Sequence, residues 1–166
     1  MIEEFWNKYL SFLEPEHPHQ SLPVPESWSF GNSKRMANEL GQLVLSGKKT
    51  ATLSRYLGED LGQELGLSII MDEEGAPLCL IETYEVLIQK FCEVTASFAA
   101  GEGEGDSSLE YWEFFERESQ TAGYELSEEM LVCCSRFKLI YPLPSKPSSA
   151  WRMSLHFAFN DRCFLA

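Results

Sequence analysis

The first segment whose residues suit chemistry runs from 47 to 52 and reads Gly-Lys-Lys-Thr-Ala-Thr. A glycine that ends a helix, followed by lysines and hydroxyls, gathers cations, hydrogen-bond donors and backbone N–H groups. Such a set suits an anion or a carbonyl oxygen. It is not a phosphate-binding P-loop, because Gln42 stands where that motif needs a glycine five residues before Gly47. The alternative interpretation is a simple surface turn.

A second segment, from Gly101 to Asp106, alternates three glycines with the carboxylates of Glu102, Glu104 and Asp106. Glycine at this density lets the backbone approach a ligand closely. Carboxylates serve in acid–base catalysis or as oxygen ligands of a divalent cation. Because the spacing departs from that of an EF-hand loop, we predict no metal ion here. The alternative is a flexible acidic loop.

Glu82 is a third candidate, because it lies inside an apolar segment with the alternating pattern of a strand. It shares one side of that strand with Leu80 and Tyr84. A buried carboxylate needs a partner, and we expect Lys49 or Arg55 to supply it. The alternative is a glutamate at the edge of a sheet, facing solvent.

The overall charge limits which partners are expected. The 166 residues hold 26 acidic and 13 basic side chains, which gives a net charge of -13. Such a field repels polyanions, so we expect no binding to long tracts of nucleic acid. Residues 33–55, however, hold five basic residues and one acidic residue. This basic segment predicts room for one phosphate, carboxylate or nucleotide; ordinary scatter of surface charge is the alternative.

Cysteine and histidine spacing gives no sign of a metal site. The five cysteines form no C-x-x-C pair, and the three histidines are not grouped with them. We therefore expect neither a metal ion nor a cofactor. The acidic N-terminus is not typical of a signal peptide, and no uncharged stretch is long enough for a membrane span. We expect a cytoplasmic protein with reduced thiols and no membrane partner.

Apolar periodicity predicts the elements that position these candidates. Two amphipathic helices come first, and residues 14–30 between them read as an extended proline-rich loop. Ser33 or Asn32 caps the second helix, and Gly47 ends it. The predicted elements are helices at 2–13, 33–46, 95–100 and 107–123, and strands at 48–53, 67–71, 78–88 and 131–141.

The order of these elements predicts the fold class. Strands and helices do not alternate as they do in a parallel α/β sheet. The long strand at 78–88 carries apolar residues on both faces, as in a small barrel with an outer layer of helices. We therefore predict an α+β fold, a small and mainly antiparallel barrel with surrounding helices, in which strand 131–141 closes the barrel.

Several motifs, taken in order, resemble the ASCH domain family. They are Trp28-x-Phe30-Gly31, Met36-Ala37-Asn38-Glu39-Leu40, the segment from Leu43 to Thr52, Ile81-Glu82-Thr83, the segment from Gly101 to Trp112, and Phe137-x-x-x-Tyr141-Pro142. The chain looks most like the bacterial branch long described as a domain of unknown function. The resemblance implies a PUA-like β-barrel and binding of RNA or a nucleoside.

One departure from the family pattern sharpens the functional expectation. The wide motif is Gly-x-Lys-x-x-Glu-x-Arg; here Gly47 and Lys49 match, while Thr52 and Ser54 replace the glutamate and arginine. This is similar to the small amidohydrolases that remove the acetyl group of N4-acetylcytidine, which have Gly-x-Lys-x-x-Thr. That resemblance implies catalysis by Lys49, Thr52 and a glutamate, for which we choose Glu102.

The resemblance also implies the surroundings of this centre. We expect the three catalytic residues to converge on one pocket at the barrel mouth, with Glu104 as the second choice of carboxylate. The predicted substrate-binding residues are Lys48, Arg55, Tyr56, Glu82, Glu104, Asp106 and Trp112. The predicted partner is a nucleoside or short RNA. Amide hydrolysis of an acylated cytidine-type nucleoside, a binding module without catalysis, and a ribonuclease all remain open.

Domain organisation follows from where the motifs stop. We predict an ASCH domain with an N-terminal helical extension over residues 1–142, and a C-terminal tail over 143–166. Residues 142–149 read Pro-Leu-Pro-Ser-Lys-Pro-Ser-Ser, a composition typical of linkers.

Truncation after Pro142 tests this boundary. We expect the shortened chain to unfold cooperatively with a midpoint within a few degrees of the full chain, because the tail adds no core contacts in this interpretation. Thermal unfolding followed by circular dichroism measures it. Loss of the cooperative transition would show that residues 143–166 pack into the core.

Overall fold

A computed structural model describes residues 1–31, 33–56, 58, 65–106, 108, 110 and 127–141. Trp112, the tail at 143–166 and the predicted helix at 107–123, apart from residues 108 and 110, therefore lie outside the described residues. So does most of the connection between the strands at 51–55 and 66–71.

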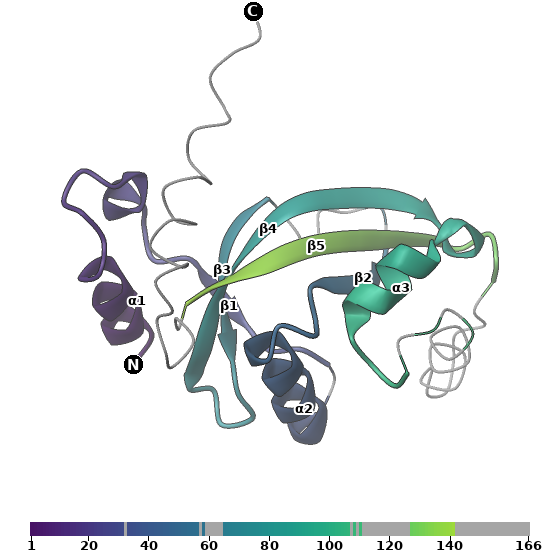
Figure 1. The fold of residues 1–166 in the computed structure, drawn as a ribbon, viewed down its shortest axis with the longest axis horizontal. Helices are drawn as coiled ribbons and strands as arrows, with labels where there is room; N and C mark the ends of the chain where they lie inside the picture. Colours follow the sequence, from purple (N-terminus) through teal and green to yellow (C-terminus); the bar gives the residue numbers. More distant parts are fainter. Residues whose placement is uncertain are drawn as a thin grey trace, which may run out of the picture.

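The described chain forms an α+β fold (Figure 1). Its elements are α1 (Ile2–Leu10), the 3-10 helix η1 (Pro18–Ser21), β1 (Glu26–Trp28), α2 (Lys34–Leu45), β2 (Ala51–Arg55), β3 (Gly66–Met71), β4 (Pro77–Lys90), the 3-10 helix η2 (Phe91–Glu93), α3 (Ala96–Glu102) and β5 (Leu131–Tyr141). For the elements that lie within the described residues, the sequence-based boundaries agree within a few residues, except that β1 stands in a segment we expected to be a loop.

The five strands form one mixed sheet in the order β1-β3-β4-β5-β2. Antiparallel pairing of β3 with β4 is confirmed, with Leu67 opposite Glu82. β5 pairs antiparallel with both β4 and β2, and β1 pairs parallel with β3. β1 and β2 are thus the two edges of an open sheet. The prediction of a barrel closed by residues 131–141 is wrong.

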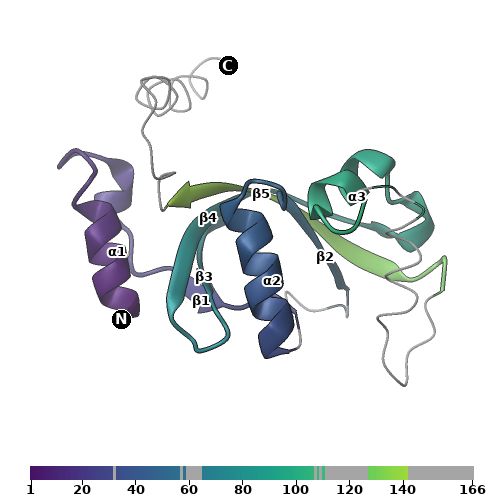
Figure 2. The same cartoon turned by 60° about the horizontal axis from the view of Figure 1, so that its bottom comes forward.

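Helix α2 explains why the described sheet stays open. Leu40 and Val44 of α2 pack against Ile70, Ile81 and Phe137 on one face of β3, β4 and β5. A helix thus covers the face that barrel closure would otherwise enclose. Figure 2 shows α2 lying along the hollow of the curved strands β3 and β4.

Helix α1 packs against the same strands through alternate residues. Ile69, Leu80 and Tyr141 form a buried cluster with Trp6 and Tyr9 of α1. Since successive strand residues point to opposite faces, Ile69 and Leu80 face away from α2. Burial on both faces of β3 and β4 accounts for their nearly continuous apolar sequence.

Helix α3 covers a third cluster, at the β2 end of the sheet. Phe98 and Ala99 pack against Ala51, Val132 and Cys134. Thr95 caps α3 by accepting the N–H of Phe98, as its position before the helix predicts, and Ser33 caps α2 in the same way through Met36. This packing holds the C-terminal end of α3 against the edge strand β2.

Two further expectations are tested by the described part of the chain. Cys79, Cys133 and Cys134 are buried free thiols, as their apolar surroundings in the sequence indicate. Among the described helices, none has the length and apolar character that crossing a membrane requires.

The histidine pair beside α1 predicts a pH dependence of stability. His17 Nδ1 accepts the backbone N–H of His19, whose own Nδ1 lies 2.7 Å from the hydroxyl of Tyr9. Burial lowers the pKa of both imidazoles, and the neighbouring His17 lowers that of His19 further. The neutral forms are therefore favoured by folding, so this stability is present above about pH 6.5 and is lost as the pH falls through the folded pKa values.

His17→Asn tests this expectation, because asparagine supplies a similar acceptor that cannot be protonated. Between pH 7.5 and pH 5, the wild type should lose about 1 kcal/mol more unfolding free energy than the variant, the size of one hydrogen bond. Urea unfolding at both pH values gives the comparison. Parallel losses in the two proteins would contradict it.

Candidate functional site

Lys49 is brought into the protein by the turn that follows α2. Gly47 has a φ of +74°, the left-handed conformation expected of a glycine that ends a helix. The N–H groups of Lys48 and Lys49 both donate to the carbonyl of Leu43, at 3.0 and 3.1 Å, and the N–H of Thr50 donates to Gly101 at 2.7 Å. These N–H groups are therefore already used, so the turn does not offer them to a ligand as its sequence suggests.

The amine of Lys49 is enclosed by oxygen atoms, and its side chain is only 1% exposed. Its Nζ forms an ion pair and hydrogen bond with the carboxylate of Glu102. It also lies 3.2 Å from Glu104 Oε1 and 3.4 Å from the backbone carbonyl of Glu102. The ring of Phe30 lies 5.6 Å from Nζ, within the range of a cation–π contact. Lys49 thus contacts Glu102, as we expected, and also Glu104, which we had named as the alternative carboxylate.

Glu102 is the buried partner, with a side chain 5% exposed. Burial raises the pKa of its carboxyl, while the charge of Lys49, its hydrogen bond and the backbone N–H of Leu53 act in the opposite direction. The bond from Leu53 also satisfies a donor on the open edge of β2. The site thus contains a carboxylate and an ammonium paired by a hydrogen bond in a poorly hydrated place, an arrangement suited to proton transfer.

Glycine at position 103 allows the backbone after α3 to approach the backbone of Lys48 closely. Gly103 has a φ of +71°, and a Cβ atom there would stand 2.5 Å from the carbonyl oxygen of Lys48. The sequence indicates that these glycines serve close approach of backbone to a ligand. At Gly103 the approach is to the backbone of Lys48, and it places Glu102 and Glu104 beside Lys49.

Thr52 is not hydrogen-bonded to Lys49 or Glu102 in the described part of the chain. It is partly buried on β2, opposite Ser135 of β5. Ala51 faces α3, so alternation directs Thr52 to the other face of the sheet. The structure brings Lys49, Glu102 and Glu104 together and leaves the hydroxyl of Thr52 outside their hydrogen bonds.

Glu82 has a different partner from the one we predicted. Its Oε2 lies 2.8 Å from Lys138 Nζ, and the two residues stand opposite each other on β4 and β5. The expectation that Lys49 or Arg55 neutralises Glu82 is therefore wrong for Lys49, which is enclosed by two other carboxylates. Opposite charges attract across neighbouring strands, but this pairing depends on a register that the sequence does not reveal.

The other predicted binding residues are spread over the surface near β2 and α3. Lys48 and Arg55 are exposed, and Tyr56 is half-buried with its N–H bonded to the carbonyl of Leu131. Asp106 is exposed, and hydrogen bonds from the side chain and then from the backbone N–H of Ser108 lower the pKa of its carboxyl. Trp112 lies outside the described residues.

The predicted basic segment does not form one surface. Lys34 and Arg35 begin α2, where Arg35 forms an exposed ion pair with Glu39, whereas Lys49 is buried. These basic residues are close in sequence, but in the structure they lie at opposite ends of α2.

Two residues of this region were missed by the sequence analysis as site residues. Phe30 packs on Phe137 and reaches Lys49, although it carries no polar group that marks it as functional. Ser135 is one of four buried polar or charged residues among those described, with Lys49, Glu102 and Thr83. A serine in an apolar strand is the signal that points to it.

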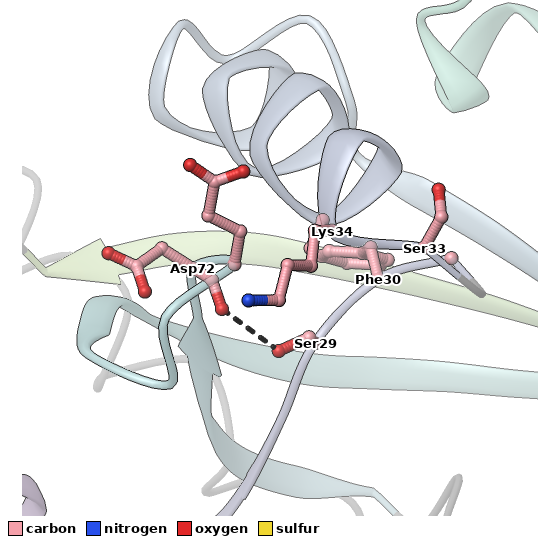
Figure 3. Close-up of a pocket in the computed structure, with 8 residues that line it drawn as sticks. Ser29, Phe30, Ser33, Lys34 and Asp72 are labelled. Carbon is pink, nitrogen blue, oxygen red and sulfur yellow. Dashed lines mark hydrogen bonds between the residues drawn. The ribbon is translucent and has the colours of Figure 1, made fainter.

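Phe30 also lines a shallow pocket of about 230 Å³ at the start of α2 (Figure 3). Its other lining residues are Ser29, Gly31, Ser33, Lys34, Ala37, Asp72 and Glu73. The hydroxyl of Ser29 donates to the carbonyl of Asp72 at 3.4 Å. Lys49 is not among these residues, so the pocket shares only a wall with the buried centre. Within the described chain, no three His, Cys, Asp or Glu side chains are grouped to hold a metal ion.

Comparison with known proteins identifies a matching domain family and two similar solved structures. The model of the ASCH domain matches residues 26–141. The crystal structure of an ASCH domain from Lactobacillus crispatus JV V101 is similar, with 31% identity, a TM-score of 0.70, and coverage of 84% of this chain and 94% of that one. A protein from Enterococcus faecalis V583, described by the family model DUF984, is similar with 34% identity, a TM-score of 0.65, and coverage of 84% and 87%. No curated protein matches the chain.

Lys49→Met tests how strongly the centre depends on its cation. We expect a loss of about 3 kcal/mol of unfolding free energy at pH 7.5, because breaking a buried pair leaves an uncompensated carboxylate. Without Lys49, the pKa of Glu102 should rise further. A carboxyl whose pKa is raised in the folded state destabilises the fold once the pH exceeds its pKa in the unfolded chain. The stability lost in Lys49→Met should therefore be smaller at pH 5 than at pH 7.5.

Lys138→Met is the matched control, because it breaks a half-exposed pair and should cost less than about 1 kcal/mol. Chemical unfolding of both variants gives the measurement. Equal losses in the two variants, or a Lys49→Met loss that does not depend on pH, would contradict the expected role of the buried charge.

Proposed function

The chain belongs to the ASCH domain family, and from that premise we propose that it binds a nucleoside or short RNA at Lys49 and Glu102. We further propose that it hydrolyses the amide of an acylated cytidine-type nucleoside there. ASCH domains are PUA-like and are generally linked to RNA binding. The amide hydrolysis is the finer part of the proposal, and it depends on the chemistry of this centre.

The observation that carries the proposal is the burial of a lysine against two carboxylates. A buried ion pair is weak evidence for stability, since apolar residues of similar size often serve as well. Glu102, whose pKa is raised by burial and lowered by the charge of Lys49, is the kind of carboxyl that concentrates at functional sites. Lys49 and Thr52 also belong to a Gly-x-Lys-x-x-Thr motif, and the acetylcytidine amidohydrolases that this sequence resembles have the same motif.

The proposed reaction starts from the form in which one proton has moved from Lys49 to Glu102. The hydroxyl oxygen of Thr52 attacks the acyl carbon, and its proton passes to the amine of Lys49. Lys49, now an ammonium, donates to the oxyanion, since the N–H groups of its turn are occupied. Glu102 gives its proton to the leaving amine, and water then cleaves the acyl-threonine ester to restore the three groups.

A bound ligand would have to bring Thr52 into this chemistry. Thr52 lies on the face of β2 that is turned away from α3, and Phe30, which contacts Lys49, belongs to the α2 cluster. A ligand on that side of the sheet would meet the hydroxyl, the amine and an aromatic wall. The net charge of -13 favours one nucleoside over a long phosphate backbone.

A binding module without catalysis is the second candidate. It is favoured by the absence, among the described residues, of a hydrogen bond between Thr52 and either Lys49 or Glu102. A ribonuclease is third, because its phosphorane needs positive charge and Lys49 is enclosed by carboxylates. The three candidates differ in what Thr52→Ala should do.

The decisive test is turnover of a panel of acylated nucleosides, read by chromatography. We expect the wild type to release an acid and the free amine from at least one N4-acylcytidine, and Thr52→Ala to lower the rate by at least a hundredfold. Ser54→Ala, two residues along the same face of β2, is the matched control and should retain activity.

Binding without turnover by the wild type would leave the non-catalytic module as the function. Full activity of Thr52→Ala would exclude the proposed nucleophile. A thermal unfolding midpoint close to that of the wild type would show that the variant is folded, as expected for a partly buried hydroxyl.

A further inference from the structure

Glu104 holds a different position from Glu102, and we propose that it is a displaceable positioning residue for Lys49. In this inference, which rests on the proposed function of the same site, a ligand binds by taking the place of the Glu104 carboxylate on the lysine. The oxygen that replaces it is the carbonyl oxygen of the ligand's acyl group. Glu104 thus competes with the ligand and keeps Lys49 oriented until the ligand arrives.

The hydrogen bonds of Lys49 leave no donor for a ligand. An ammonium has three N–H bonds, and three oxygens surround this one: the Glu102 carboxylate, the Glu102 carbonyl at 3.4 Å and Glu104 Oε1 at 3.2 Å. A ligand oxygen that is to accept a hydrogen bond from Lys49 must therefore replace one of the three.

The two carboxylates differ in how firmly they are held. The side chain of Glu102 is 5% exposed, lies in α3 and also accepts the N–H of Leu53. The side chain of Glu104 is 21% exposed and lies beyond the end of the helix, between Gly103 and Gly105. Both glycines have left-handed backbone conformations, with φ of +71° and +54°. Glu104 is the acceptor that can move to water.

Charge also favours departure of Glu104. With both carboxylates ionised, the cluster of Lys49, Glu102 and Glu104 carries one excess negative charge. Release of Glu104 leaves the neutral pair of Lys49 and Glu102, whereas loss of Glu102 would leave a buried cation with a partly exposed partner. Release of Glu104, the more exposed carboxylate, therefore leaves no buried charge without its partner. The vacated N–H then points at a neutral carbonyl oxygen, which it polarises for attack.

Binding of N4-acetylcytidine tests the competition. Measurements are made in a Thr52→Ala background, so that no turnover occurs, with and without Glu104→Ala. We expect Glu104→Ala to tighten binding about tenfold, because the ligand no longer displaces a carboxylate. Glu104→Gln, which keeps a neutral acceptor and the side-chain volume, should give an intermediate affinity. Glu16→Ala, which also removes one exposed carboxylate but outside the predicted binding residues, is the control and should leave the affinity unchanged.

A second measurement does not depend on any nucleoside. Hydrogen exchange of the Lys49 ammonium, followed by 15N magnetic resonance, should be several-fold faster in Glu104→Ala and unchanged in Glu16→Ala. Unchanged exchange in both Glu104 variants would overturn the inference, and so would weaker nucleoside binding by both. Faster exchange with no nucleoside binding in any variant would support the role of Glu104 while contradicting the proposed function.

Discussion

An ion pair sealed from solvent, between Lys49 and Glu102, ties together three parts of the chain that are distant in sequence. Lys49 comes from the turn after α2, Glu102 from the last turn of α3, and the N–H of Leu53 from the edge strand β2. Neither charge is tolerable there without the other. The close contact of Gly103 with Lys48 is therefore a condition of the site, because it brings the end of α3 to the lysine.

This constraint also explains how an open sheet has an enclosed polar centre. β2 is an edge strand, and an edge exposes unpaired N–H and C=O groups. The C-terminal end of α3 covers that edge: Gly101 accepts the N–H of Thr50, and Glu102 accepts that of Leu53. The contacts that cover the edge of β2 also bury the carboxylate of Glu102. The same packing of α3 therefore protects the sheet edge and forms the site.

Local signals in the sequence were sufficient to predict most elements, but not the main contact of the site. The caps at Ser33 and Thr95, the glycine at 47 and the alternation in β3, β4 and β5 act over a few residues, so they can be read without a fold. The motif resemblance supplied the connection between Lys49 and Glu102, which are 53 residues apart. No periodic pattern could have supplied it.

What the sequence did not reveal depends on register and on packing between distant segments. The pairing of Glu82 with Lys138 requires a particular register of β4 and β5, which contains two irregularities. Closure of a sheet depends on what fills its inner face, and here α2 does so. β1 is three residues long and pairs through its backbone with β3, so its side chains carry little information about it.

Thr52 shows how these two kinds of information combine. Its place in the motif comes from the sequence, but its direction comes from alternation along β2, which turns it away from the helix that carries Glu102. Lys49 lies at the start of that edge strand, within reach of α3 through Glu102 and of the opposite face through Phe30. The lysine is therefore the group that can connect a carboxyl on one side of the sheet with a hydroxyl on the other. A reaction that uses all three groups would have to take place around its amine.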